Sequence, residues 1–140
     1  MDRLVSFGFR TKDYNGFSIH IYSMSKGFFI TCAIDYPNGK LHMGHIYEKT
    51  IADVVARVHR LNGENVLFSV GTDEHGEKIQ KAAKEAGVAP QEYVDGMAAE
   101  FQKLFDQCLI SYDRFIRTTD PDHVKSAQFF FQKMWDADDI

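Results

Sequence analysis

The segment from Phe28 to Leu61 constrains the fold more than any other part of the sequence. It opens with FFITCAI at positions 28–34, an apolar run rich in β-branched and aromatic residues, and the turn signal PNG follows at 37–39. This pattern predicts a buried strand that ends in a turn. A helix is predicted next, from the HMGH sequence at 42–45 to Leu61, because apolar residues recur at three- and four-residue steps. These apolar positions are Tyr47, Ile51, Val54, Val58 and Leu61, and the opposite face carries Lys49, Asp53, Arg57 and Arg60.

The first turn of this helix is a candidate anion site. Unpaired backbone N–H groups and the positive end of the helix dipole meet at a helix N-terminus, which favours phosphate. His42 and His45 are three residues apart, so their imidazoles share one face and can both donate to phosphate oxygens. Gly44 has no side chain, so a nucleotide can approach the backbone there.

The remaining pattern predicts an α/β fold with a parallel sheet. Residues 65–70 form a second apolar run, and strand, helix, strand in this order implies a right-handed crossover. The loop at 71–76 then leaves the sheet at the same edge as HMGH, where open α/β sheets bind ligands. Further helices are predicted at 77–86, from Pro90 to Cys108 and from Asp120-Pro121 to Trp135, with a third strand at 113–118.

Three sequence blocks resemble one known family. AIDYPNGK at 33–40, HMGH at 42–45 and GTDEHG at 71–76 are similar to the class I aminoacyl-tRNA synthetases, in particular the methionyl family. The resemblance runs from about Lys26 to the last residue. It implies that residues 24–140 are the N-terminal half of a Rossmann-like, HUP-type catalytic domain. Residues 1–23 are interpreted as an extra segment that is not native or is disordered, with Met24 as the natural start.

By this resemblance, the HMGH block binds ATP. His42 and His45 match catalytic positions of the family, and Gly44 completes its signature. Lys40, in the preceding turn, is a further candidate for phosphate binding, although exposure to solvent is the better explanation of a loop lysine.

The amino-acid site is implied in the same way. Asp73 matches the residue that holds the ammonium group of the substrate, since a carboxylate both neutralises and orients a cationic ligand. Ile34 and Tyr36 match residues that line the methionine pocket, although core packing also explains Ile34. His75 fits either a ligand contact or a hydrogen bond within its loop. Asp35 departs from the tyrosine or proline of the family and is expected to add negative charge near the pocket mouth.

The implied reaction is the activation of L-methionine by ATP with Mg²⁺, followed by transfer to tRNA(Met). Such chemistry needs donors on the phosphate oxygens. The chain ends before the second ATP-binding signature, the tRNA-binding region and any zinc-binding insertion of the family. We therefore expect these residues alone to bind ATP weakly and to be inactive in aminoacylation.

Composition narrows the partners and the compartment. Sixteen Lys and Arg against twenty Asp and Glu give a net charge of −4, so no overall basic field attracts nucleic acid. Cys32 and Cys108 are interpreted as reduced core residues, which suggests a cytoplasmic protein without a zinc site here.

The aromatic residues of the last helix, Phe129 to Phe131 and Trp135, exceed what the predicted elements can cover. We expect further chain to cover them.

Three alternatives remain open. His42, His45, Asp73 and His75 could bind a metal in a hydrolase, because histidine and carboxylate are good ligands of zinc and manganese. An HxGH nucleotidyltransferase acting on another small molecule is the second alternative. The third is a non-catalytic remnant or ATP-binding module.

Overall fold

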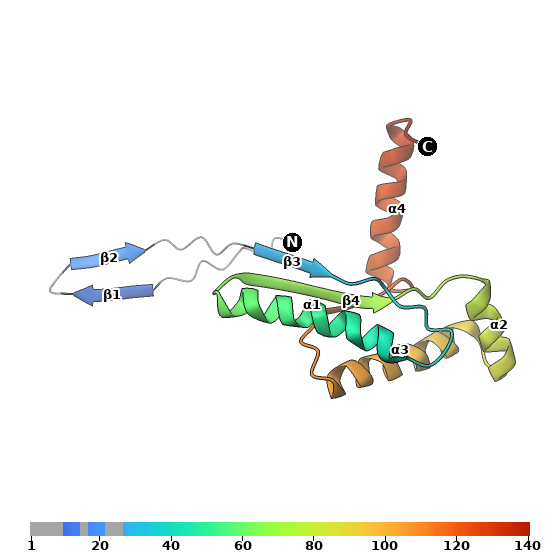
Figure 1. Ribbon diagram of the computed structural model, residues 1–140. Helices are drawn as coiled ribbons and strands as arrows, with labels where there is room; N and C mark the ends of the chain where they lie inside the picture. The colour runs from blue at the N-terminus through green and yellow to red at the C-terminus, as the bar shows by residue number, and fades with distance from the viewer. Residues whose placement is uncertain (1–9, 15–16, 22–26) are drawn as a thin grey trace.

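The computed structural model describes residues 10–14, 17–21 and 27–140, and its central part is a three-stranded parallel sheet (Figure 1). The strand order is β3-β4-β5, and parallel pairing joins each neighbouring pair. In chain order, the elements are β1 (Arg10–Tyr14), β2 (Phe17–Ile21), β3 (Gly27–Thr31), α1 (Met43–Leu61), β4 (Asn65–Thr72), α2 (Glu77–Ala86), α3 (Pro90–Gln107), β5 (Arg114–Arg117) and α4 (Pro121–Asp136). The predicted α/β class, the parallel sheet and the order of elements from residue 27 onward are confirmed.

Strand β3 is shorter than the apolar run predicted. It ends at Thr31, and the chain pairs with β4 again only at Asp35, which forms an isolated parallel bridge with Thr72. The N–H of Asp35 donates to Gly71 O at 2.9 Å, and the N–H of Asp73 donates to Asp35 O at 2.9 Å. The segment after β3 is therefore tied to the carboxyl end of β4.

Gly71 allows β4 and β5 to approach closely. A Cβ atom at this position would lie 2.1 Å from the carbonyl oxygen of Ile116 in β5. Because this neighbour is backbone in a paired strand, it cannot move aside as a flexible side chain could.

Helix α1 presents the opposite face from the one that its apolar pattern predicts. The larger apolar residues point to solvent: Tyr47, Ile51, Val54, Val58 and Leu61 are between 49% and 86% exposed. The buried residues are Lys49, Ala52, Asp53 and Ala56. Alanines let the helix lie close to the sheet. The two buried charged residues, Lys49 and Asp53, both have polar partners. The prediction of the packed face was therefore wrong.

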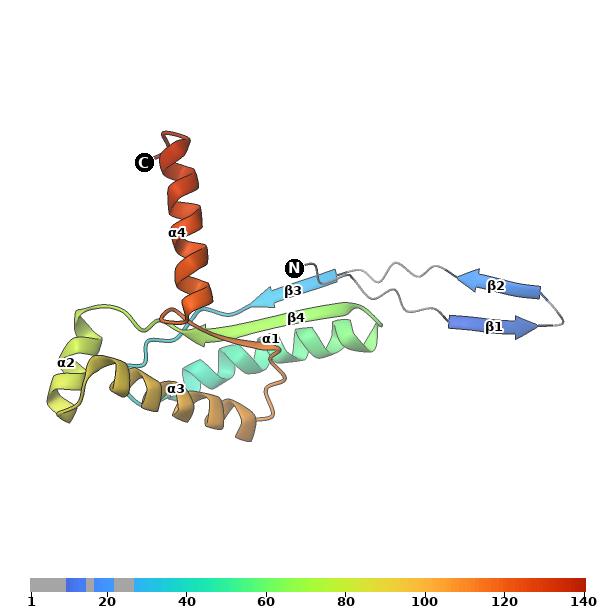
Figure 2. The same ribbon diagram turned by 180° about the vertical axis from the view of Figure 1, so that it is seen from behind.

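The core lies between the sheet and helices α1 and α3, which occupy the same side of the sheet in both views (Figure 1, Figure 2). Phe68 and Val70 of β4 pack there with Ala52 and Ala56 of α1 and with Phe105 of α3. On β3, Phe28 stacks on His59 of α1, with ring centroids 3.5 Å apart. The opposite face carries Phe29 and Leu67, which are paired across β3 and β4 and are exposed.

Helix α3 buries most of its predicted stripe. Val94, Ala98, Phe101 and Phe105 are buried, whereas Cys108 is exposed just beyond the end of the helix. The interpretation of Cys108 as a core residue was therefore wrong. Cys32, in contrast, is buried, and burial raises the pKa of its thiol.

Helix α4 projects away from the sheet in both views (Figure 1, Figure 2). Pro121 begins the helix as predicted, and none of its residues is buried. Phe129, Phe130, Phe131 and Trp135 are each more than half exposed.

Two strands in the first part of the chain were not predicted. β1 and β2 pair antiparallel, from Arg10 opposite Ile21 to Tyr14 opposite Phe17. Met24, the predicted natural start, lies outside the described residues. Within the described part of the chain, no helix is long and apolar enough to cross a membrane.

Candidate functional site

The site begins at the N-terminus of α1, where two histidines cap the helix. His42 is the N-cap residue, and its Nδ1 accepts a hydrogen bond from the N–H of Gly44 at 3.1 Å. In return, the N–H of His42 donates to Nδ1 of His45 at 3.2 Å. The two imidazoles lie against each other, with centroids 3.8 Å apart. The motif thus satisfies backbone donors that a helix start leaves unpaired.

These hydrogen bonds select the tautomer of both rings. A ring nitrogen that accepts a hydrogen bond carries no proton, so a neutral imidazole accepting at Nδ1 has its proton on Nε2. His42 is exposed and His45 is partly exposed, which leaves their Nε2–H groups available to a ligand. Two donors therefore sit where the helix dipole also favours an anion.

A side chain at position 44 would crowd the same cap. A Cβ atom here would lie 3.0 Å from Cε1 and 3.1 Å from Nδ1 of His42. The ring would have to shift to make room. The glycine therefore has a structural reason in the cap itself, in addition to the nucleotide approach that the sequence suggested.

The amino-acid side of the predicted site lies at the carboxyl end of β4. Tyr36 is 52% exposed, and a hydrogen bond to the Asp73 carboxylate raises the pKa of its phenol. Asp73 itself is only partly buried, so it remains open to a ligand. Ile34, on the same segment as Tyr36, is 42% exposed, which argues against core packing as the reason for this residue.

The sequence suggested that Asp35 adds negative charge near the pocket mouth, but the structure shows that it does not. It is 5% exposed and pairs with the fully buried Lys49, whose Nζ lies 2.7 Å from Oδ1. Lys49 also donates to Ala33 O at 3.0 Å and to Glu48 Oε2 at 3.2 Å. The negative charge is therefore neutralised inside the fold.

Glu48 joins the same group of residues. Its Oε1 accepts from the N–H of Ala33 at 3.0 Å. Burial opposes ionisation of Glu48, but the hydrogen bonds from Ala33 and Lys49 outweigh it and lower the pKa of the carboxyl.

Behind Asp73, a buried carboxylate holds the loop. The side chain of Glu74 is fully buried and accepts from Arg117 Nε at 2.7 Å and from Arg117 Nη2 at 2.9 Å. It also accepts from Thr72 Oγ1 at 2.7 Å and from the hydroxyl of Thr119. Arg117 donates in addition to Asp95 of α3 at 2.6 Å. A bidentate ion pair of this kind fixes both distance and plane, so β4, β5 and α3 position the loop together.

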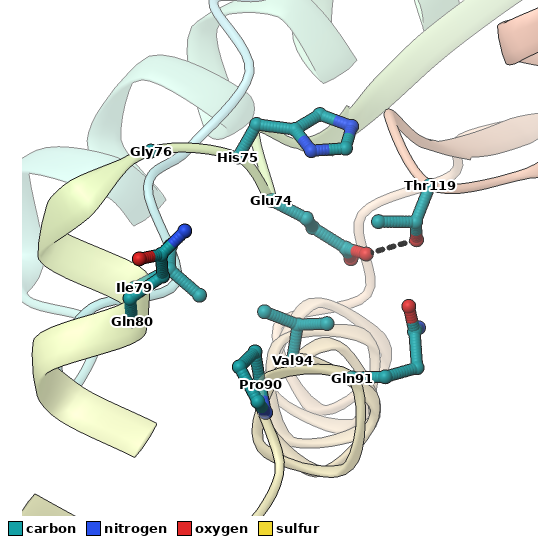
Figure 3. Close-up of a pocket in the computed structure, with 9 residues that line it drawn as sticks. All are labelled: Glu74, His75, Gly76, Ile79, Gln80, Pro90, Gln91, Val94 and Thr119. Atoms are coloured by element: carbon teal, nitrogen blue, oxygen red, sulfur yellow. Dashed lines mark hydrogen bonds between the residues drawn. The ribbon is translucent and has the colours of Figure 1, made fainter. Parts of the chain in front are cut away.

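A cavity of about 160 Å³ opens on the other side of Glu74 (Figure 3). Ile79 of α2 and Val94 of α3 form its apolar part, and the hydrogen bond between Glu74 and Thr119 closes one side. Both carboxylate oxygens of Glu74 accept hydrogen bonds from protein groups, namely Thr72, Arg117 and Thr119.

Two predicted residues remain at the margin of the site. Nε2 of His75 lies 3.2 Å from Thr118 O, which favours a loop-stabilising role for this side chain. Lys40 is exposed, at the edge of a separate hollow formed with Leu41 and Phe101. Among the described residues, no group of three or more His, Cys, Asp or Glu side chains could hold a metal ion.

Comparison with known proteins identifies the family to which this fold and the two-histidine cap belong. The family model described as tRNA synthetases class I (M) matches residues 28–140, so the chain belongs to this family.

Its relatives are methionine–tRNA ligases. That of Deinococcus radiodurans is 56% identical over 114 residues, and that of Clostridium tetani is 50% identical over 115 residues. These matches cover 81% and 82% of this chain but 17% and 18% of the relatives, so the chain spans less than a fifth of their length.

A solved structure gives the same result. Mycobacterium tuberculosis methionyl-tRNA synthetase in complex with methionyl-adenylate superposes with a TM-score of 0.78 at 42% identity. The match covers 80% of this chain and 22% of that one. The resemblance inferred from the three sequence blocks and the Rossmann-like fold class are confirmed.

Sequence reasoning missed Lys49, Glu48 and the partners of Glu74. Lys49 has a signal in hindsight, because it shares the small-residue face of α1 with Ala52 and Ala56. A lysine among alanines at helical spacing predicts a buried charge with a specific partner. Arg117 carries no such signal, since its partner Glu74 lies 43 residues away in the sequence.

Proposed function

We propose that the protein carrying this chain is a methionine–tRNA ligase, and that these residues form part of its catalytic domain. The reaction would join L-methionine to the α-phosphate of ATP and then transfer the methionyl group to tRNA(Met). The observation that carries the proposal is the pair of Nε2–H donors at the N-terminus of α1, in a chain 56% identical to a methionine–tRNA ligase.

In this proposal, His42 and His45 stabilise ATP phosphate. Their Nε2–H groups donate to oxygens that gain negative charge as pyrophosphate leaves, and a fixed tautomer avoids reorganisation at that moment. Gly44 leaves the backbone approachable, and Lys40 adds positive charge nearby. Mg²⁺ would enter with ATP, and we assign it no ligand among the described residues.

Asp73 would receive the ammonium group of methionine. Tyr36 orients this carboxylate through their hydrogen bond and, with Ile34, offers apolar surface to the thioether. His75 supports the loop that carries Asp73. Because residues 24–140 would then be the N-terminal half of the domain, we expect the 140 residues alone to bind ATP weakly and to be inactive.

We further propose that tRNA(Met) is bound by other regions of the protein, because the chain has a net charge of −4. A cytoplasmic reaction fits translation and a chain in which Cys32 and Cys108 form no disulfide.

The test is methionine-dependent exchange of labelled pyrophosphate into ATP by the complete gene product. Exchange with methionine, and not with other amino acids, supports the proposal, whereas exchange only with another acid would defeat it. Asp73→Asn should abolish methionine-dependent exchange. The matched control is Asp106→Asn, because Asp106 contacts Tyr112 just before β5 starts, at the opposite edge of the sheet.

A further inference from the structure

Lys49 is the most buried charged residue of α1. Its side chain is 0% exposed, and its Nζ donates to Asp35 Oδ1, Ala33 O and Glu48 Oε2. A lysine is almost never fully buried without partners, and here three acceptors match the three ammonium protons. All three acceptors belong to the segment after β3 or to the neighbouring residue on α1.

Asp35 depends on this lysine. Its Oδ1 accepts from Lys49, and its Oδ2 is a buried atom with no hydrogen-bond partner among the described residues. A buried carboxylate that lost its single cationic partner would be strongly unfavourable.

The backbone around this pair belongs to the predicted methionine pocket. The N–H of Ala33 donates to Glu48 Oε1, while its carbonyl oxygen accepts from Lys49. At Asp35, the N–H donates to Gly71 O and the carbonyl oxygen accepts from the N–H of Asp73. Residues 33–35 are thus held by side chains of α1 on one side and by the end of β4 on the other.

The residues that would touch substrate lie on the solvent side of this segment. Ile34 and Tyr36 flank Asp35 and are exposed, while Asp35 points inward to Lys49. The Asp35 carbonyl oxygen fixes the backbone of Asp73, and the Tyr36 hydroxyl bonds to the Asp73 side chain. A shift of Asp35 would therefore move both walls of the pocket at once.

We propose that Lys49 is a positioning residue for the methionine pocket: through Asp35 and Ala33 it fixes the segment that carries Ile34 and Tyr36 against Asp73. This inference rests on the proposed function. It assigns to helix α1 a role at each side of the site, with the histidine cap directed to ATP and Lys49 acting on the amino-acid pocket.

The test measures pyrophosphate exchange by the complete gene product as a function of methionine and of ATP. Lys49→Met should raise KM for methionine about tenfold or more, because small misplacements of a pocket are costly, and should change KM for ATP less than about threefold. Asp35→Asn, which keeps an acceptor oxygen for Lys49 but removes its negative charge, should show the same selectivity with a smaller effect and serves if Lys49→Met does not fold.

The matched control is Arg60→Met. Arg60 lies in the last turn of the same helix and pairs with Asp113 at 2.7 Å, so its loss also removes an ion pair of α1. Lys49→Met and Arg60→Met should both lower Tm, but only Lys49→Met should raise KM for methionine. A purely structural role for Lys49 would change KM for methionine and KM for ATP by the same factor, or would change KM for methionine equally in Lys49→Met and Arg60→Met. Either result would overturn the inference.

The two proposals fail differently. If the unsubstituted protein shows no methionine-dependent exchange, the proposed function is wrong and the positioning role falls with it. If the unsubstituted protein is active and Lys49→Met and Asp35→Asn both keep its KM for methionine, only the positioning role is wrong.

Discussion

The N–H of His42 donates to Nδ1 of His45 at 3.2 Å, so the residue that caps helix α1 is itself held by a residue one turn further on. Nδ1 of His42 in turn accepts from Gly44. Each imidazole therefore uses one nitrogen for the fold and keeps the other for a ligand. This division separates the structural and the chemical contributions of each histidine, and substitutions can measure them independently.

His42→Asn should separate the two contributions. Asparagine is a good N-cap, so the free energy of unfolding should stay within about 0.5 kcal/mol of the unsubstituted protein, whereas His42→Ala should lose about 1 kcal/mol. Both variants lack the Nε2–H donor, so both should lower the pyrophosphate-exchange rate by about 10²–10³-fold. Denaturant unfolding and exchange assays check this, and an Asn variant with normal exchange would contradict the role of Nε2.

Two tyrosines that each contact an aspartate should titrate above the ordinary pKa of tyrosine. Burial, with Asp106 nearby, raises the pKa of Tyr112 to about 12, while the hydrogen bond to Asp73 raises the pKa of the exposed Tyr36. Asp73→Asn should return Tyr36 toward its ordinary value of 10, because its hydrogen bond to Asp73 is the main cause. Asp106→Asn should lower the pKa of Tyr112 only in part, because burial remains.

Ultraviolet difference titration against Tyr36→Phe and Tyr112→Phe assigns the two transitions. Each aspartate variant serves as the control for the other. A Tyr36 transition that does not move in Asp73→Asn would show that the two side chains are not hydrogen-bonded.

Gly71→Ala should destabilise the sheet severely. The new Cβ would stand 2.1 Å from Ile116 O, so β4 and β5 would have to separate, at a cost of about 3 kcal/mol or more. Gly39→Ala is the matched control, because nothing lies within 4 Å of a Cβ there. Thermal unfolding followed by circular dichroism measures both, and equal Tm values would show that the strands are not so closely paired.

From residue 27 onward, the sequence predicts the order and type of the elements because each signal for them is local. Pro90 and Pro121 begin α3 and α4, and the apolar run at 65–70 becomes β4. The packed face of α1 was missed because both faces have helical spacing, and only the nearby sheet selects the small residues. The ion pairs of Lys49 and Arg117 join residues distant in sequence, so periodicity and local propensity carry no information on them.

The exposed stripe of α1 should tolerate polar residues. Val54 and Val58 are 56% and 50% exposed, so Val54→Lys and Val58→Glu should change the free energy of unfolding by less than about 0.5 kcal/mol. Ala56→Lys places a charge at a fully buried position against the sheet and should prevent folding. Unfolding of the 140-residue chain in urea checks both, and tolerance of Ala56→Lys would reverse the assignment of the two faces.

Asp53 should make stability depend on acid pH. Burial opposes ionisation of this carboxyl, but hydrogen bonds from Ser111 and Arg57 outweigh it and hold its pKa below the ordinary 3.8. A pKa lower in the folded than in the unfolded chain stabilises the fold above the unfolded value, and this stabilisation is lost as pH falls through the folded value. Asp53→Asn should therefore cost about 1–3 kcal/mol near pH 7, with the difference from the unsubstituted chain shrinking below about pH 4. Urea unfolding between pH 3 and 7 measures it, with the exposed Glu100→Gln as the control. A difference independent of pH would mean that Asp53 acts through its shape and neutral hydrogen bonds, and that its charge does not stabilise the contact between α1 and Ser111.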